Sequence, residues 1–386
     1  MSDVHRVFET LFQRKPVFVT RAPGRVEFIG NHTDHNGGQV LGAAVNRFLR
    51  VGVAPREDGE VHFASEGNPK VEVFPDIESA LSRGEGWLRY PLGVLQLLRE
   101  KGVSFDGGFS FLVSSAIPSG AGLSSSAAFE LASSLAFEEL SGQTIDRLER
   151  VRLCRRAENE VVGVPCGILD QGVSGFGEEN RLVHIDCADE TIRTVAGPVD
   201  SCLWVFESGI KHSLVDSLYA ERHGECVQAF EMIREVFPEI QFLAHVTPAQ
   251  LDEVEDRMPE VIVKRARHVI GENRRVEQCV RLLEISDLEG VGRLLKESHW
   301  SSSKLFENSI PELDTLVSLL SQEDLVFGAR LTGGGFGGAV MALGSNDFSE
   351  EDARRVADSF ADEYGSSPRF AKMSITEGAV VEVSKP

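Results

Sequence analysis

The first half of the chain mixes short runs of β-branched and aromatic residues with two stretches of helical periodicity. Such runs predict strands, here over residues 17–20, 40–54, 71–74 and 109–113. Apolar residues recur at steps of four from Leu123 to Leu135, which predicts a helix over residues 123–140. A second helix is predicted from about residue 144 to a point before Gly163.

The pattern of predicted elements changes near residue 201. A predicted strand over residues 202–207 precedes long charged helical stretches from about residue 214 to 321. The remaining predicted elements are strands over residues 326–331 and 339–343, a helix over 350–360, and strands over 369–373 and 380–383. Because strands and helical runs are segregated along the chain, the pattern favours an α+β fold over a doubly wound parallel sheet. Gly197-Pro198 indicates a soft boundary between the two halves.

Composition and charge narrow the class of protein. The 386 residues correspond to two or three domain-sized units, and the formal net charge of −21 argues against nucleic acid or an anionic membrane as the main partner. The N-terminus has no apolar segment of a secretory signal, and no apolar run approaches the ~18 residues of a membrane span. The six cysteines are widely spaced and form no CxxC pair, so we expect reduced thiols in a cytoplasmic protein.

Glycine exceeds its usual share of about 7%, and the 37 glycines gather in three segments. The first covers residues 21–38, where Asn31, His32, Thr33 and Asp34 place hydrogen-bonding side chains in one short loop. Arg25 adds a fixed cation with a fork of donors. This density suits a polyhydroxylated ligand. The alternative is a polar turn with Arg25 in a surface ion pair.

The second segment, residues 118–128, lies between a predicted strand and a predicted helix. Glycines allow close backbone approach, free N–H groups at a helix N-terminus bind anions, and a serine hydroxyl can ligate Mg²⁺. The segment lacks the Gly-Lys-[Ser/Thr] of a Walker A loop. The pattern favours phosphate binding over an ordinary serine N-cap. The candidate residues are Gly120, Ala121, Gly122, Leu123, Ser124, Ser125 and Ser126.

The third segment, residues 331–339, contains a formal GxGxxG at Gly333, Gly335 and Gly338. A dinucleotide-binding fingerprint opens a helix, whereas residues 339–343 are predicted as a strand. The segment is therefore expected to be a turn between strands that faces a ligand or the first half of the chain.

Two acidic residues are catalytic or metal-binding candidates. Asp170 lies in a segment, residues 166–172, that reads as a glycine-flanked loop. Glu158 falls on the apolar stripe of the second predicted helix, and a buried carboxylate needs a cation or strong donors. That cation is either Arg152 or Arg155 or a metal ion, and the sequence leaves the two possibilities open.

The three glycine segments, in this order and spacing, resemble the three motifs of the GHMP small-molecule kinases, and within that superfamily the chain resembles the galactokinases. Residues 208–214, 297–299 and 309–314 are also similar to that family. The resemblance covers nearly the whole chain. It implies two lobes, residues 1–198 and 199–386, with the active site in the cleft between them.

The resemblance also implies an activity, the ATP-dependent phosphorylation of the C1 hydroxyl of galactose. By this resemblance Asp170 faces the anomeric hydroxyl with Arg25 beside it, and Ser126 and Glu158 hold Mg²⁺. Residues 120–126 match the phosphate loop, and Trp87 resembles a residue near adenine. The sugar-binding candidates are Asn31, His32, Thr33, Asp34, Gly167 and Tyr219.

Two positions depart from the family pattern, since most galactokinases carry Glu where this chain has Asn31 and Tyr where it has His35. The family's Glu contacts the sugar near its C6 hydroxyl, so the departure bears on which sugar is bound. The alternatives are a C1 kinase for galacturonate, arabinose or N-acetylgalactosamine, a catalytically silent sugar sensor, and, furthest from the pattern, an NAD-dependent dehydrogenase. The expected partners are a small sugar and ATP, and the expected state is a monomer or weak homodimer.

Overall fold

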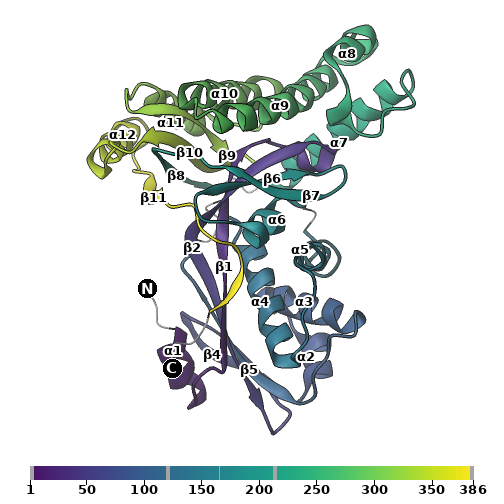
Figure 1. Cartoon of the computed structure of the whole chain (residues 1–386), viewed down its shortest axis with the longest axis vertical. Helices are drawn as coiled ribbons and strands as arrows, with labels where there is room; N and C mark the ends of the chain where they lie inside the picture. The colour runs from purple at the N-terminus through teal and green to yellow at the C-terminus, as the bar shows by residue number, and fades with distance from the viewer. Residues whose placement is uncertain (1–3, 119–121, 165, 212–214, 383–386) are drawn as a thin grey trace.

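The computed structural model describes residues 4–118, 122–164, 166–211 and 215–382 of the chain. Within them the strands form two sheets, each covered by helices (Figure 1). The larger sheet consists of β1 (Phe18–Ile29), β2 (Gln39–Arg56), β3 (Val61–Ser65), β4 (Asn68–Phe74), β5 (Gly108–Ser115), β6 (Arg181–Asp186), β7 (Thr191–Ala196) and β12 (Val380–Glu382). The smaller sheet consists of β8 (Ser201–Lys211), β9 (Val326–Thr332), β10 (Gly337–Ser345) and β11 (Arg369–Met373).

The larger sheet has the strand order β12-β1-β2-β5-β3-β4, with β6 paired to β2 and β7 to β6. Its pairs are antiparallel except β3 with β5. The long β1–β2 pair changes register at Pro23/Gly24 and again near Ile29. Such irregularities bend a strand and re-aim its side chains. They bracket Arg25 and Glu27, which lie two residues apart and therefore on one face of β1.

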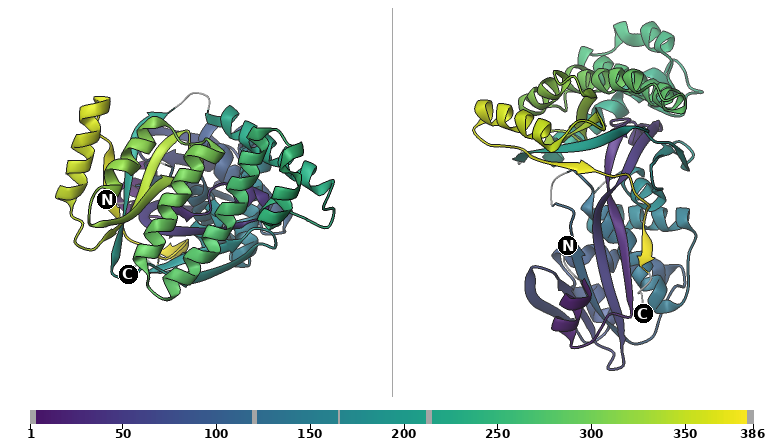
Figure 2. Two further views of the ribbon diagram at one scale, coloured as in Figure 1. Left: turned by 90° about the horizontal axis from the view of Figure 1, so that it is seen from above. Right: turned by 60° about the vertical axis from the view of Figure 1, so that its left-hand side comes forward.

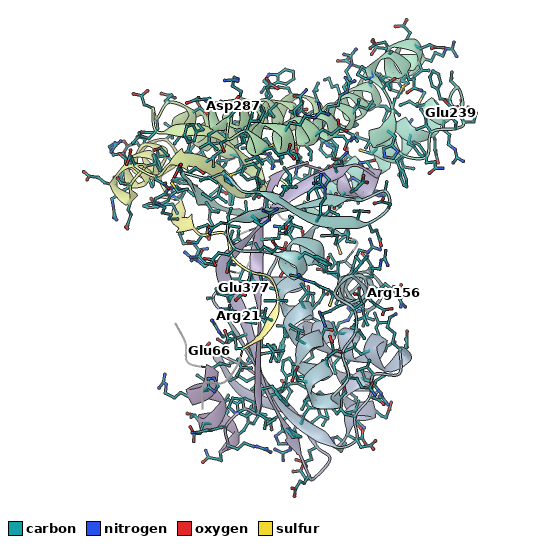
Figure 3. All side chains as sticks on the ribbon, in the orientation of Figure 1. Arg21, Glu66, Arg156, Glu239, Asp287 and Glu377 are labelled. Carbon is teal, nitrogen blue, oxygen red and sulfur yellow. The ribbon has the colours of Figure 1, made fainter. Side chains whose placement is uncertain are left out.

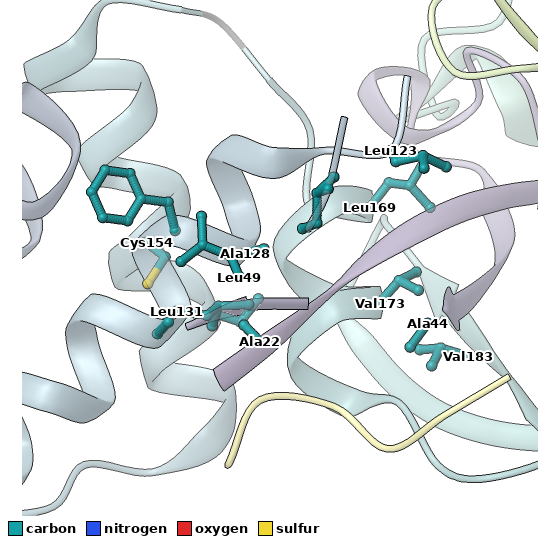
Figure 4. Close-up of a cluster of buried hydrophobic side chains, with 14 of the residues drawn as sticks. Ala22, Ala44, Leu49, Leu123, Ala128, Leu131, Cys154, Leu169, Val173 and Val183 are labelled. Carbon is teal, nitrogen blue, oxygen red and sulfur yellow. The ribbon is translucent and has the colours of Figure 1, made fainter. Parts of the chain in front are cut away.

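The helices of the first part of the chain pack on one side of the larger sheet, except α1 (Val4–Phe12), whose Val4 and Phe8 pack on the opposite face against Val19, Ala54, Ala64 and Leu112. The other helices are α2 (Ile77–Arg83), η2 (Gly86–Leu88), α3 (Arg89–Glu100), α4 (Ser125–Ser141), α5 (Arg147–Arg156), the π-helical turn η3 (Ala157–Val162) and α6 (Leu169–Phe176). The central helix α4 is buried on nearly every side, which its many Ala and Ser residues allow. Figure 4 shows Ala22 of β1, Leu49 of β2, Leu131 of α4 and Val173 of α6 in the core that α4 completes.

The second part of the chain forms the smaller sheet and a long helical layer over it (Figure 1). Its helices are α7 (Val215–Arg234), η4 (Leu243–His245), α8 (Pro248–Val254), η5 (Glu255–Arg257), α9 (Glu260–Glu284), α10 (Leu288–Ser301), the π-helical turn η6 (Ser302–Phe306), α11 (Pro311–Ser321) and α12 (Glu350–Tyr364). Figure 2 shows that the β1–β2 ribbon runs up from the first part into this second part. The loop between these two strands, including η1 (Asp34–Asn36), therefore lies at the junction.

The predicted α+β fold is confirmed, as are the predicted strands, which the structure lengthens at most ends. The elements that were not predicted from the sequence are α1, α2, α3, β3, β6 and β7. The prediction that Asp170 lies in a loop was wrong, because it occupies the first turn of α6. Glycine-rich sequence disfavours a helix locally, but burial of Leu169 and Val173 against the core outweighs this.

Two further observations concern the chain as a whole. After β11 the chain leaves the smaller sheet, and β12 pairs with β1 in the larger sheet. The two parts of the chain are therefore not separate along the sequence. Among the described residues, no helix combines the length and the apolar character needed to cross a bilayer.

Candidate active site

A cavity of about 390 Å³ opens where the β1–β2 loop, the η3 and α6 region and the second part of the chain meet. Its lining comes from β1, from the loop after it, from η3, α6 and the segment between them, from α7, and from the glycine turn between β9 and β10. The lining residues are Arg25, Glu27, Asn31, His32, Asp34, Glu158, Gly163, Val164, Cys166, Gly167, Leu169, Asp170, Tyr219, Ala220, Gly333 and Gly334.

Asp170 is held from two sides at the start of α6. Arg25 brings Nε to 2.7 Å and Nη2 to 2.6 Å from Asp170 Oδ1. Ser124 Oγ donates a hydrogen bond to Oδ2. The Arg25 side chain is buried, whereas 24% of the Asp170 side chain is exposed toward the cavity. Asp170 is therefore a fixed carboxylate with one oxygen, Oδ2, open to a further donor. The alternative of a surface ion pair for Arg25 is excluded.

The second glycine segment bends sharply before α4. Gly122 and Ser124 both have positive φ, 70° and 52°. Arg25 Nη1 donates to the carbonyl of Gly122 at 2.5 Å. The backbone N–H of Arg25 donates to the carbonyl of Leu123 at 3.0 Å. Ser124 precedes Ser125, the first residue of α4, but its side chain does not cap the helix. The ordinary serine cap is therefore excluded. The predicted residues Gly120 and Ala121 lie outside the described residues.

Glu158 lies in the π-helical turn η3, with its carboxylate directed at α6. Gln171 Nε2 donates to it at 2.6 Å, and the Cys166 thiol lies 3.4 Å from the same oxygen, Oε2. Burial raises the pKa of Glu158, the negative charge of Asp170 raises it further, and a hydrogen bond from Ser126 opposes the rise. A bound cation would relieve this unfavourable electrostatics.

Neither arginine that could have neutralised Glu158 does so. Arg152 and Arg155 both pair with Glu190, at 2.5 Å and 2.7 Å, and neither lines the cavity. Among the described residues, Glu158 is instead held by neutral donors, the Gln171 amide, the Cys166 thiol and the Ser126 hydroxyl. Glu158 and the adjacent Ser126 hydroxyl are hard oxygen donors of the kind that Mg²⁺ prefers. Two protein ligands suit Mg²⁺ bound chiefly by water and phosphate oxygens, and no group of three or more His, Cys, Asp or Glu side chains forms a metal site within the described part of the chain.

The β1–β2 loop lines the opposite wall of the cavity. His32 has a φ of 58° and stacks on Phe306, with ring centroids 4.3 Å apart. Burial, with the nearby charge of His35, lowers the pKa of His32 to about 3, so the ring is neutral. Its Nε2 lies 3.0 Å from the carbonyl of Gly334 and must carry the proton. The Nδ1 lone pair is then left as an acceptor.

Asp34 forms an ion pair with its neighbour His35, with Oδ1 and Nδ1 3.2 Å apart. Burial alone lowers the pKa of His35, but hydrogen bonding to Asp34 outweighs it and raises the pKa to about 9. On Gly167 a Cβ atom would lie 2.0 Å from Asp34 Oδ2, so only glycine fits there. Tyr219 of α7 closes this wall against the His32 ring, with centroids 5.2 Å apart.

Several predicted residues lie outside the cavity lining: Gly122, Leu123, Ser124, Ser125 and Ser126 of the second glycine segment, and also Thr33 and Trp87. Thr33 is fully buried, and its Oγ1 lies 2.7 Å from the carbonyl oxygens of both Gly30 and Gln39, so that its one hydrogen is shared between them and holds the loop in shape. Trp87 stacks on Phe129 at 6.0 Å between centroids, on the sheet side of α4. The structure thus brings the Asp170, Glu158 and Asn31 regions together, and leaves the side chains of Thr33 and Trp87 apart from them.

The sequence reading missed Glu27, which lines the cavity and is nine-tenths or more buried. Glu27 follows Arg25 by two residues on β1 and so shares its face, but the predicted strand ended at residue 20 and gave no such signal. Cys166 was also missed as a lining residue. Gly333 and Gly334 lie in the turn between β9 and β10, as predicted for the third glycine segment, and this turn faces the cavity.

Three family models match the chain. They are the GHMP kinases N terminal domain over residues 89–178, the galactokinase galactose-binding signature over residues 6–55, and the GHMP kinases C terminal domain over residues 279–366. Among solved structures, a mevalonate kinase shares the fold at 17% identity with a TM-score of 0.69, covering 93% of this chain and 99% of that one. Fold and site together define a GHMP-type small-molecule kinase.

Full-length relatives make the assignment narrower. The galactokinase of Roseiflexus sp. is 35% identical over all of this chain and 98% of that protein, and that of Clostridium beijerinckii is 34% identical over 96% of each. The crystal structure of Lactococcus lactis galactokinase complexed with galactose matches with a TM-score of 0.92 at 31% identity, covering 98% of both chains. The chain belongs to the galactokinase family.

Proposed function

We propose that this chain transfers the γ-phosphoryl group of ATP to the C1 hydroxyl of galactose. Membership of the GHMP kinases implies ATP as the phosphoryl donor. The observation that supports the proposal best is Asp170, a carboxylate fixed by Arg25 and Ser124 at the floor of the cavity, with Oδ2 open to a hydroxyl donor.

In the proposed reaction the sugar O–H proton passes to Asp170 Oδ2 while the sugar oxygen bonds to the γ-phosphorus and the bond to ADP breaks. Arg25 would neutralise charge on both Asp170 and the transferred group. The N-terminus of the 17-residue helix α4 faces the same region and favours phosphate there. These roles ask mainly for positioning and charge stabilisation, which is what phosphoryl transfer requires.

Ser126 and Glu158 would hold Mg²⁺, which, when bound, neutralises phosphate charge. Glu158 is directed there by the Gln171 amide. We expect Ser126→Ala to raise the Mg²⁺ concentration needed for half-maximal activity several-fold, because one oxygen ligand is lost. The measurement is an Mg²⁺ titration at saturating ATP, with Ser141→Ala at the far end of α4 as the matched control. An unchanged titration would contradict the proposed ligation.

We also propose the division into lobes of residues 1–198 and 199–386, with β12 of the second range returning to pair with β1 of the first. It is supported by β8, the first strand of the smaller sheet, which begins at Ser201.

The decisive experiment is ADP release by the purified chain with galactose, arabinose, galacturonate and N-acetylgalactosamine, with the product located by ³¹P–¹H NMR. We expect galactose to give the highest kcat/KM and the phosphate to appear on O1. Preference for another sugar would overturn galactose as the proposed substrate. Galactose binding without ADP release would support a catalytically silent sugar sensor instead.

A further inference from the structure

We propose that Glu27, and not Asn31, is the side chain of this pocket that reads a hydroxyl of the sugar, and that Asn31 holds Glu27 in place. This inference rests on the proposed function. The family resemblance assigns a sugar contact to position 31, where this chain has an amide instead of the usual carboxylate. Both residues line the cavity, so the question is which of them has hydrogen-bonding capacity left for a ligand.

The Asn31 amide has no capacity left. Its Nδ2 donates to Glu27 Oε1 at 3.0 Å and to the carbonyl of Gly333 at 2.8 Å, which uses both hydrogens. Its Oδ1 accepts from Asn308 Nδ2 at 2.9 Å and from Ser302 Oγ at 3.2 Å, which uses both lone pairs. The side chain is almost completely buried. A sugar hydroxyl could bind Asn31 only by breaking one of these bonds.

Glu27 differs, because its two oxygens are unequally occupied. Oε1 accepts from Arg330 Nη2 at 2.9 Å and from Asn31 at 3.0 Å. Among the described residues, Oε2 receives only the longer 3.4 Å contact from Asn31 Nδ2. Oε2 therefore keeps acceptor capacity for a donor in the cavity. Burial raises the pKa of Glu27, and the salt bridge with the fully buried Arg330 side chain opposes that rise and favours the carboxylate form.

The backbone of Glu27 is fixed as firmly as its side chain. Its N–H donates to Thr332 Oγ1 at 3.0 Å, and the same hydroxyl donates back to its carbonyl at 3.1 Å. Arg330 Nη1 also donates to that carbonyl, at 3.2 Å. A carboxylate held in this way reads a donor in a defined position and repels a ligand carboxylate. The chemistry thus favours a neutral aldose over a uronate at this wall of the pocket.

The test pairs Glu27→Gln with deoxygalactoses that lack one hydroxyl each, at C2, C3, C4 or C6. In the unaltered chain, removal of the hydroxyl that Glu27 reads should lower kcat/KM by at least about tenfold. In Glu27→Gln the KM for galactose should rise with a much smaller change in kcat, and the penalty for that one deoxy sugar should fall to about threefold or less. Penalties at the other positions should persist.

Two controls accompany the test. Glu239→Gln makes the same change on the exposed tip of the second part of the chain, far from the cavity, and should leave all penalties unchanged (Figure 3). Glu27→Asp keeps a charge for Arg330 while withdrawing the carboxylate by one methylene, and serves if Glu27→Gln does not fold. In Glu27→Asp the kcat/KM penalty for the same deoxy sugar should also fall to about threefold or less.

The outcomes separate the two proposals. If the unaltered chain releases no ADP with galactose, the proposed function fails, and this inference fails with it. If galactose is phosphorylated but every deoxy penalty survives in both Glu27 variants, only the assignment to Glu27 is overturned.

Discussion

The role of Ser124 depends on a single backbone conformation. In sequence it is one of three adjacent serines at a helix start, each equally able to cap the helix or bind phosphate. In the structure its φ of 52° and ψ of 62° turn the side chain away from α4, and its hydroxyl donates to Asp170. A left-handed conformation is costly for a residue other than glycine. Here it links the glycine segment directly to the carboxylate of the site.

At the same scale, replacing the carboxylate of Asp170 should separate chemistry from binding. Asp170→Asn keeps the size of the side chain but removes the acceptor of the sugar proton, so kcat should fall by about 10²- to 10⁴-fold. ATP should still bind, as measured by calorimetry with a non-hydrolysable analogue. Asp358→Asn on the exposed face of α12 is the control and should keep full turnover. A kcat within a factor of ten of normal for Asp170→Asn would remove this residue from the proposed role.

Among the elements, α10 and β9 approach so closely that their backbones touch. A Cβ on Gly292 of α10 would lie 2.2 Å from the carbonyl oxygen of Phe327, and a Cβ on Gly328 of β9 would lie 2.2 Å from that of Gly292. The neighbours are backbone atoms, which have no alternative rotamer. Through this contact the helical layer packs closely on the smaller sheet. The same strand β9 contains Arg330 and Thr332, which both hydrogen-bond to Glu27.

Gly292→Ala should therefore lower the free energy of unfolding by about 1–3 kcal/mol or more, through overpacking. Urea unfolding followed by circular dichroism measures it. Gly224→Ala in α7 is the matched control, since nothing lies within 4 Å of its added Cβ. It should raise stability by about 0.5–1 kcal/mol, because alanine favours a helix over glycine. Equal effects at the two positions would contradict the close contact as the cause.

Across the whole molecule, α9 of the second part holds the β1–β2 loop of the first. Glu272 Oε1 accepts from the backbone N–H groups of Gly30 and Asn31, both at 3.1 Å. His268 Nε2 donates to the carbonyl of Asn31 at 3.0 Å, and its Nδ1 accepts from Ser301 at 2.9 Å. The cavity wall is thus positioned by residues more than 230 positions away in sequence.

This arrangement predicts a stability that depends on pH. Burial lowers the pKa of His268 to about 4, from an ordinary value of 6.5. Below pH 6.5 the unfolded chain therefore binds a proton that the folded chain does not, and stability falls as the pH decreases toward 4. His268→Gln should reduce that slope by up to about 1.4 kcal/mol per pH unit. The measurement is urea unfolding between pH 7 and 4.5, with His245→Gln at an exposed position as the control, and an unchanged slope would contradict it.

Much of the fold and part of the site could be predicted from sequence because their signals are local. Strands such as β2 and the core helix α4 follow from apolar runs and periodicity. The glycine segments indicated the loop around Asn31 and the turn before α4. The helix at Asp170 and the side-chain targets of Ser124 and Arg155 depend on long-range packing, which carries no local signal.

The sequence by itself determined the class of fold, the three glycine segments and the candidate residues, because each rests on residue type and spacing along the chain. Tertiary structure decided which of those residues share a cavity and which have hydrogen bonds left to offer. Asn31 is saturated by partners from η6, the loop before α11 and the glycine turn, while Glu27, which was not among the predicted site residues, keeps a free acceptor. The physical reason is that hydrogen-bonding capacity depends on neighbours in space, and those come from hundreds of residues away.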